Sequence, residues 1–311
     1  MRKLGDDNPV PLYKEQGIHM EGVADNDFML VIMSAVQRCM LQKFGSDRIC
    51  IESTHGMTGY DFELSTLLVI DEYDEGFPVA FFFSSSVDTE HLTIFYECVK
   101  TSAGVIKPHS FMSDDAPAFY NAWSRVMGAV ENRLLCTWHV DRAWQGKLTT
   151  ITDKEKREKV YRGLKACQTE LDKENFSRMF TELLLQLAID SDTVAFGQYL
   201  TAHYNNRPET WAYCYRIGSK INTNMHIENF HKIIKHIYME GKKSKRVDKC
   251  IDALFTHLRD KQFDRQHKLH KGKLSSKVAA IVQRHSASIP LARYHVRAVR
   301  SMSVVSTIYY F

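Results

Sequence analysis

The order of β-rich and helical segments constrains the fold of this chain more than any other feature of its sequence. Short runs of β-branched, aromatic and aliphatic residues predict strands at 48–53, 64–70, 79–84, 110–113 and 134–136. Apolar residues at helical spacing predict helices at 26–45, 88–102, 115–127 and 140–148. Closely spaced strands pair as an antiparallel meander, whereas strands separated by helices join the sheet in parallel through crossovers. The sequence therefore predicts an α/β fold with a mixed five-stranded sheet flanked by helices.

This order, three strands and then alternating helices and strands, is that of an RNase H-like sheet. Residues 153–220 follow; they are rich in Lys and Glu, have apolar residues at helical spacing and show no strand signal. This pattern predicts an all-helical insertion before the last catalytic helix. A helix from about 225 to 239, a basic turn at 241–246 and a helix near 247–263 come next. We expect five regions: a lead-in and helix at 1–45, the RNase H-like core at 46–150, the insertion at 151–220, the completing helix and basic segment at 221–265, and a tail at 266–311.

Composition excludes several classes of protein and leaves others open. Hydrophobic residues make up 44% and charged residues 25% of the 311 residues, which is typical of a globular protein. No apolar run approaches the roughly 18 residues of a membrane span, so we expect no membrane partner. The cysteines are scattered and odd in number, which indicates free thiols in a reducing compartment. They are Cys39, Cys50, Cys98, Cys136, Cys167, Cys214 and Cys250.

Charge is distributed unevenly along the chain. Residues 1–150 carry a net charge of −9 and the remainder +13, although the whole chain is only +4. An acidic half followed by a basic half suggests carboxylate chemistry in one region and contact with a polyanion in the other. Alternatively, the uneven charge reflects only chance variation in the solvated surface residues along the chain.

Three acidic residues lie where an RNase H-like nuclease needs carboxylates. Glu52 lies on the first strand, Asp114 ends the fourth strand, and Glu228 lies on a late helix. Such carboxylates hold two divalent metals, Mg²⁺ or Mn²⁺, which activate a water or a 3′-hydroxyl and stabilise the leaving oxygen. Taken alone, each acid could instead be a solvated surface residue with no role in metal binding. The neighbouring Asp115 is more simply interpreted as the N-cap of the next helix.

Cys136 and His139 form the one pair with metal-ligand spacing, Cys-x-x-His. A closed zinc site needs four ligands, and no second such pair lies nearby in the sequence. Cys167 or Cys214 from the insertion are candidate further ligands. A buried cysteine beside a hydrogen-bonded histidine, without zinc, is the alternative.

A basic stretch follows the third acid and is a candidate DNA-binding surface. Placed there, its side chains would line a path for DNA phosphates towards the metals, although a solvated helical face would show the same composition. The candidate residues are Lys232, Lys235, Lys242, Lys243, Lys245 and Arg246.

Four sequence blocks resemble the transposase domain of Mutator-like (MULE) elements. They are ICIESTHGMTGYDFELSTLLVIDEY, FMSDDAPAFYNAW, LLCTWHVDRAW and NTNMHIENFHKIIK, in this order, and the resemblance covers about 25–265. It implies that the acidic triad of the family falls on Glu52, Asp114 and Glu228, and its Cys-x-x-His motif on Cys136 and His139. It also implies cut-and-paste DNA strand transfer in the ancestral family, DNA as partner and a nuclear location.

Two departures from the family pattern point to a domesticated or relic copy. The family has aspartate where this chain has Glu52, and the extra methylene displaces a carboxylate whose position a two-metal site constrains tightly. The zinc-binding modules that flank the domain in many family members do not occur in this sequence, so we expect recognition of transposon ends to be lost. Two functions stay open: a weakened Mg²⁺-dependent DDE-type nuclease, and a non-catalytic DNA- or protein-binding regulator. A homodimer is compatible with both.

Overall fold

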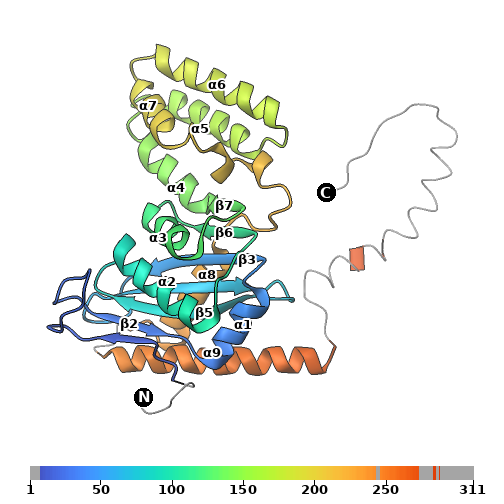
Figure 1. Cartoon of the computed structure of the whole chain (residues 1–311). Coiled ribbons are helices and arrows are strands. Elements are labelled where there is room, and N and C mark those ends of the chain that lie inside the picture. The colour runs from blue at the N-terminus through green and yellow to red at the C-terminus, as the bar shows by residue number, and fades with distance from the viewer. Residues whose placement is uncertain (1–7, 243–245, 273–282, 285–286, 288–311) are drawn as a thin grey trace.

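The computed structural model describes residues 8–242, 246–272, 283–284 and 287, and it shows an α/β fold built on one mixed sheet (Figure 1). Seven strands form this sheet in the order β1-β2-β5-β4-β3-β6-β7. Their bounds are β1 Leu12–Lys14, β2 Met29–Ile32, β3 Arg48–Thr54, β4 Glu63–Ile70, β5 Gly76–Ser84, β6 Ser110–Ser113 and β7 Asn132–Leu135. The α/β class is confirmed. The prediction of five strands is wrong, because two strands precede the five that the sequence indicated.

The extra strands come from the segment expected to be a lead-in and one helix at 26–45. Residues 29–32 are fully buried and pair antiparallel with β5, while β1 pairs with β2 at the edge of the sheet. Helix α1 (Ala35–Phe44) begins only after Ser34, whose side chain forms a capping box with Gln37. A short continuous apolar run fits a buried strand as well as a buried helix, so periodicity alone could not separate the two.

Pairing within the sheet fixes which residues lie side by side. Strands β3, β4 and β5 form the antiparallel meander, in which Glu52 pairs with Thr66. Strand β6 joins β3 in parallel, with Cys50 beside Met112, and β7 joins β6 in parallel, with Ser113 beside Leu135. The ends of β3, β6 and β7 therefore reach the same edge of the sheet.

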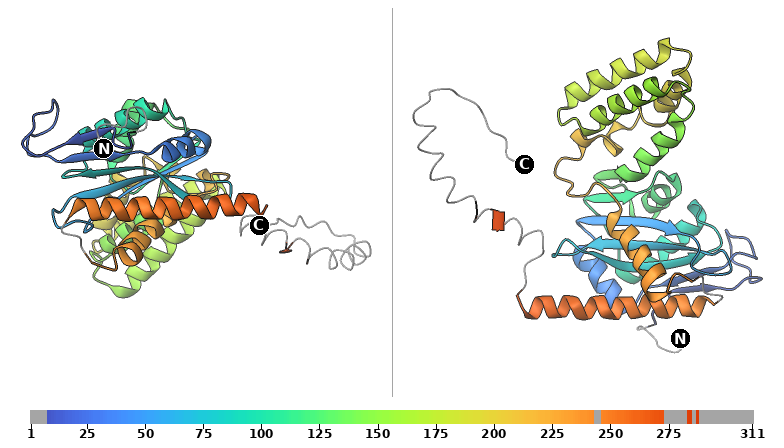
Figure 2. Two further views of the ribbon diagram at one scale, coloured as in Figure 1. Left: turned by 90° about the horizontal axis from the view of Figure 1, so that it is seen from below. Right: turned by 180° about the vertical axis from the view of Figure 1, so that it is seen from behind.

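Helices cover both faces of the sheet. Helices α1, α2 (Thr89–Ala103) and α3 (Pro117–Met127) lie on one face, and α8 (Met225–Ile233) crosses the other (Figures 1 and 2). A π-helical turn, η4 (Ile234–Tyr238), continues α8, and α9 (Val247–His270) runs along the lower edge of the domain. The main core lies between these layers and includes Phe81, Phe82, Phe95 and Trp123, all with no exposed surface.

Residues between β7 and α8 fold as helices around a second apolar cluster. These elements are α4 (Thr137–Leu148), α5 (Lys154–Thr169), α6 (Lys173–Ile189), α7 (Val194–His203), η2 (Pro208–Thr210) and η3 (Tyr213–Tyr215). Trp144 from α4 packs edge-on against Trp211 and Tyr204 at the centre of this cluster. The segment at 153–220 contains no strand, as its composition predicted, and α4 packs with it. Among the described residues, no helix is both long and apolar enough to cross a bilayer.

Candidate metal centre

Strand register brings the first two acids together. Glu52 lies two residues beyond Cys50 in β3, and Asp114 lies two residues beyond Met112, the parallel partner of Cys50 in β6. Cys136 directly follows Leu135, the partner of Ser113 in β7. Because parallel neighbours advance together, Glu52, Asp114 and Cys136 reach the same edge of the sheet. All three are buried or half-buried.

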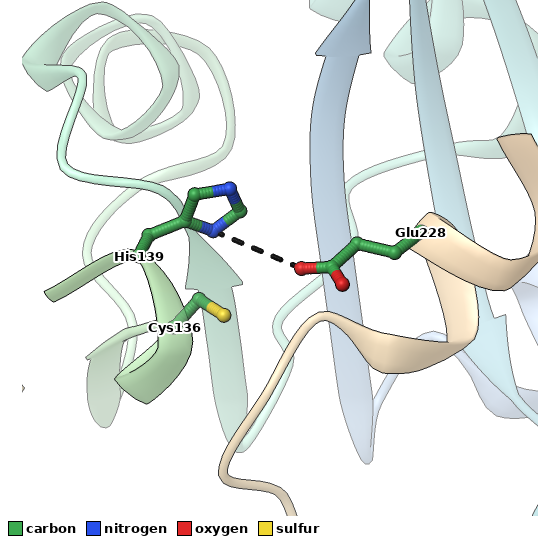
Figure 3. A group of neighbouring side chains, drawn as sticks. All are labelled: Cys136, His139 and Glu228. Atoms are coloured by element: carbon green, nitrogen blue, oxygen red, sulfur yellow. Dashed lines mark ion pairs between the residues drawn. The ribbon is translucent and has the colours of Figure 1, made fainter. Parts of the chain in front are cut away.

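Helix α8 adds the third acid across this edge, and α4 inserts a histidine between two of the acids. His139 Nε2 lies 3.8 Å from Glu52 Oε1, and His139 Nδ1 lies 4.0 Å from Glu228 Oε1. Figure 3 shows the imidazole ring pointing towards Glu228, with Cys136 below it on the same helix turn. The two glutamates, which are 176 positions apart in the sequence, therefore flank one ring.

The carboxylates influence one another electrostatically. Burial, together with the charges of Glu228 and Asp114, raises the pKa of Glu52 to about 8, although the charge of Lys235 acts in the opposite direction. Burial also raises the pKa of Asp114, although the hydrogen bond from the Ala116 backbone N–H and the charge of His139 lower it in part. Clustered buried acids of this kind favour either a proton or a cation among them.

Several polar atoms in this cluster have no hydrogen-bond partner among the described residues. They are Glu52 Oε2, Glu228 Oε1 and His139 Nδ1, and each is buried. A buried polar atom without a partner costs free energy, so unpaired atoms gathered in one place fit a site that binds a cation. The chemistry of the donors, two carboxylates and an imidazole, is that of a divalent-cation site.

Cys136 completes a second set of donors around the same histidine. The ligand atoms of Cys136, His139 and Glu228 all lie within 4.8 Å of one another. Burial raises the pKa of the Cys136 thiol, while the backbone N–H groups of Asn224, His139 and Trp138 lower it. The Asn224 N–H donates to Cys136 Sγ over 3.3 Å. These three residues can hold a metal ion, whereas Cys167 and Cys214 lie in the apolar cluster of the insertion.

Asp115 is not the N-cap that its position suggested. The cap of α3 is Ala116, which makes no side-chain cap hydrogen bond. Asp115 instead forms an ion pair of 2.7 Å with Arg207 and accepts a hydrogen bond from Tyr204 Oη. Asp115 thereby connects the loop after β6, next to Asp114, with the helical insertion. No local sequence pattern reveals this contact.

The proposed basic DNA-binding residues differ in their surroundings. Lys235, on η4, is half-buried and donates to Thr54 Oγ1 over 2.5 Å beside Glu52, so it belongs to the metal centre. Lys232 is exposed, Lys242 pairs with Glu240, and Arg246 makes hydrogen bonds with Asp248. Lys243 and Lys245 lie outside the described residues.

Sequence reasoning identified the three acids, Cys136 and His139 but missed two features of this centre. The position of His139 between Glu52 and Glu228, and the contact of Lys235 with Thr54, join residues that are distant in the sequence. The Cys-x-x-His spacing marked the histidine, yet nothing local indicated which acids it would meet. No protein-family model matches the chain, and no curated protein matches it.

Proposed function

We propose that this chain is a transposase-derived DNA-binding protein with an RNase H-like core, whose strand-cutting activity is weakened by Glu52. The observation that carries the proposal is the convergence of Glu52, Asp114 and Glu228 from a strand, a strand end and a late helix. The order β5-β4-β3-β6-β7 and the parallel addition of β6 and β7 also fit an RNase H-like sheet. The resemblance of four sequence blocks to MULE transposases supports DNA as the substrate class and a nuclear location.

The unpaired oxygens of Glu52 and Glu228 and the raised pKa of Asp114 fit a site for divalent cations. Glu52, Asp114 and Glu228 would hold Mg²⁺ or Mn²⁺, which supplies activation of a water or 3′-hydroxyl and stabilisation of the leaving oxygen. Lys235 places a positive charge beside Glu52, where it favours the ionised carboxylate that a cation requires. Its hydrogen bond to Thr54 fixes this charge at the end of β3.

A non-catalytic regulator is the second candidate, and one observation favours it. The imidazole of His139 stands between Glu52 and Glu228, within 4.0 Å of each carboxylate. Two-metal chemistry needs ions roughly 3.5–4 Å apart that share carboxylates, and a ring between two of the acids obstructs such sharing. In this case the fold would retain DNA or protein binding without cutting.

Nicking of supercoiled plasmid in Mg²⁺ or Mn²⁺ tests the proposal. We expect little or no nicking by the natural chain and a gain of up to about a hundredfold for Glu52→Asp, because small misplacements of a reacting group cost about that much. Asp114→Ala in the Glu52→Asp background is the control and should abolish the gain. Efficient nicking by the natural chain that Asp114→Ala abolishes would show that Glu52 is not disabling. Absence of nicking by both chains would favour the regulator.

A further inference from the structure

The Cys136–His139–Glu228 cluster differs chemically from the three carboxylates beside it. Mg²⁺ prefers oxygen ligands and retains several waters, whereas a thiolate and an imidazole favour zinc and other borderline transition metals. A set of one sulfur, one nitrogen and one carboxylate oxygen therefore selects a different ion from a set of three carboxylates.

The spacing of the donor atoms is close to that of a bound ion. Around a tetrahedral zinc ion the ligand atoms stand about 3.5 Å apart. The ligand atoms of Cys136, His139 and Glu228 already lie within 4.8 Å of one another, and His139 Nδ1 and Glu228 Oε1 are 4.0 Å apart. Small side-chain rotations are enough to close this gap. Three ligands leave a fourth position for a water or another oxygen.

Two of these donors are buried atoms that lack any hydrogen-bond partner among the described residues, His139 Nδ1 and Glu228 Oε1. The third, Cys136 Sγ, accepts a hydrogen bond from the Asn224 backbone N–H. A donor of this kind stabilises a thiolate, the form of cysteine that binds metal. Figure 3 shows all three side chains directed into one space between α4 and α8.

Glu52 lies beside the ring nitrogen of His139 that does not face Glu228, where it can orient the ring for this ion. Metal-bound histidines usually donate their second ring N–H to a carboxylate, which fixes the ring orientation. With Nδ1 of His139 facing Glu228, Nε2 faces Glu52 Oε1 at 3.8 Å. The longer side chain of glutamate, compared with the aspartate of the related transposases, extends the carboxylate towards this nitrogen.

We propose that Cys136, His139 and Glu228 bind one transition-metal ion of the zinc class, and that Glu52 orients His139 for it. This inference deepens the proposed function, because it rests on the same acids and makes Glu228 a ligand of a second type of ion. An ion held there would withdraw Glu228 from the three-acid site. Zn²⁺ is therefore expected to inhibit any nicking that Mg²⁺ supports.

Cobalt(II) titration of the full, reduced chain tests the proposal without relying on nicking. We expect one equivalent of Co²⁺ to give a near-ultraviolet charge-transfer band from a thiolate ligand, and Zn²⁺ to displace it. Cys136→Ser should abolish the band. Cys214→Ser, which changes another buried cysteine in the insertion, is the matched control and should retain it.

Ligand and outer-shell variants extend the test to proteins that keep Cys136. His139→Gln should lower Co²⁺ affinity at least tenfold, since loss of an outer-shell partner alone costs about 10–100-fold. Glu52→Asp should lower affinity about tenfold, although the proposed nuclease would gain activity from the same change. Asp114→Asn should leave the cobalt spectrum unchanged while it removes any residual nicking, so loss of nicking alone does not contradict the metal site. Absence of the band in the natural chain, or a band that survives Cys136→Ser, would overturn the proposal.

Discussion

His231 lies in an interior that excludes its charged form. It is 5% exposed, its Nε2 lies 3.0 Å from Thr66 Oγ1, and burial, together with the charge of Lys235, lowers its pKa to about 3. Although it directly precedes Lys232 of the basic stretch, it is a neutral core residue near neutral pH. It lies on the side of α8 that faces Thr66 of β4, so a histidine next to a basic run need not contribute to a DNA-binding surface.

The pKa of His231 predicts a pH dependence of stability. The unfolded chain takes up a proton near the ordinary histidine pKa of about 6.5, whereas the folded chain resists it down to about 3. The contribution of His231 to the free energy of unfolding should therefore be constant above about pH 6.5 and fall as the pH drops from there towards 3. The contribution of this residue lost at pH 5 is roughly 2 kcal/mol.

Urea denaturation at pH 7.5 and pH 5 of the natural chain and His231→Gln measures this contribution. Glutamine can maintain a hydrogen bond to Thr66 but does not titrate. We expect the variant to lose about 2 kcal/mol less than the natural chain between the two pH values. An equal loss in both proteins would show that His231 is protonated in the folded chain.

Among the elements, α9 is held to the sheet by charge as well as by apolar packing. Arg265 pairs with Asp71 at 3.1 Å, with side chains 11% and 3% exposed, and also forms hydrogen bonds with Glu72. Lys268 pairs with Glu75 in the same loop between β4 and β5. The acidic turn that separates two strands in the sequence is thus the docking site of a helix almost 200 residues later.

Removal of Arg265 should destabilise the chain. Breaking a buried ion pair costs about 3–5 kcal/mol. Because Asp71 keeps hydrogen bonds from the backbone N–H groups of Tyr73 and Glu75, we expect Arg265→Ala to lower the free energy of unfolding by about 2–4 kcal/mol.

Arg259→Ala, on the same helix, is the control for this loss. Arg259 is 74% exposed and pairs only with its neighbour Asp260 among the ion pairs of the described residues. Exposed pairs contribute about 0–1 kcal/mol, so chemical denaturation should show a much smaller loss. Similar losses for both variants would indicate that helix propensity, rather than the buried pair, accounts for the effect.

Across the whole molecule, the basic C-terminal half should give DNA affinity that depends on salt. Reversal of Lys242, Lys243, Lys245 and Arg246 to glutamate should weaken binding and reduce the slope of log affinity against log salt by about 0.9 for each lost phosphate contact. Fluorescence anisotropy with a labelled duplex at several salt concentrations measures both quantities.

A matched reversal distinguishes a local DNA-binding surface from net charge. Lys154, Lys159, Arg162 and Lys173 are exposed on the helical insertion and change the charge of the chain by the same amount when replaced by glutamate. We expect this variant to bind DNA more tightly than the first. Equal weakening by both sets would show that the run at 242–246 acts only through net charge.

The sequence alone determined the central elements and the positions of two acids. Strands β3 to β7 and the helices between them follow from continuous apolar runs and helical spacing, which are local properties. Because Glu52 lies within one such run and Asp114 directly follows another, their places near strand ends were also predictable. Glu228 was a candidate because it lies on a late helix, and the resemblance to a family supported this choice, since no local feature distinguishes it from other helical acids.

Tertiary structure alone decided the pairing of β1 and β2 with the sheet and the composition of the metal centre. The apolar run at 29–32 becomes a strand because the edge of β5 is available to it, a condition that no local pattern contains. His139 meets Glu52 and Glu228 because parallel register aligns β3, β6 and β7 while the insertion returns the chain to α8. Contacts across such separations depend on register and on the packing of whole elements, and periodicity within one element carries no information about either.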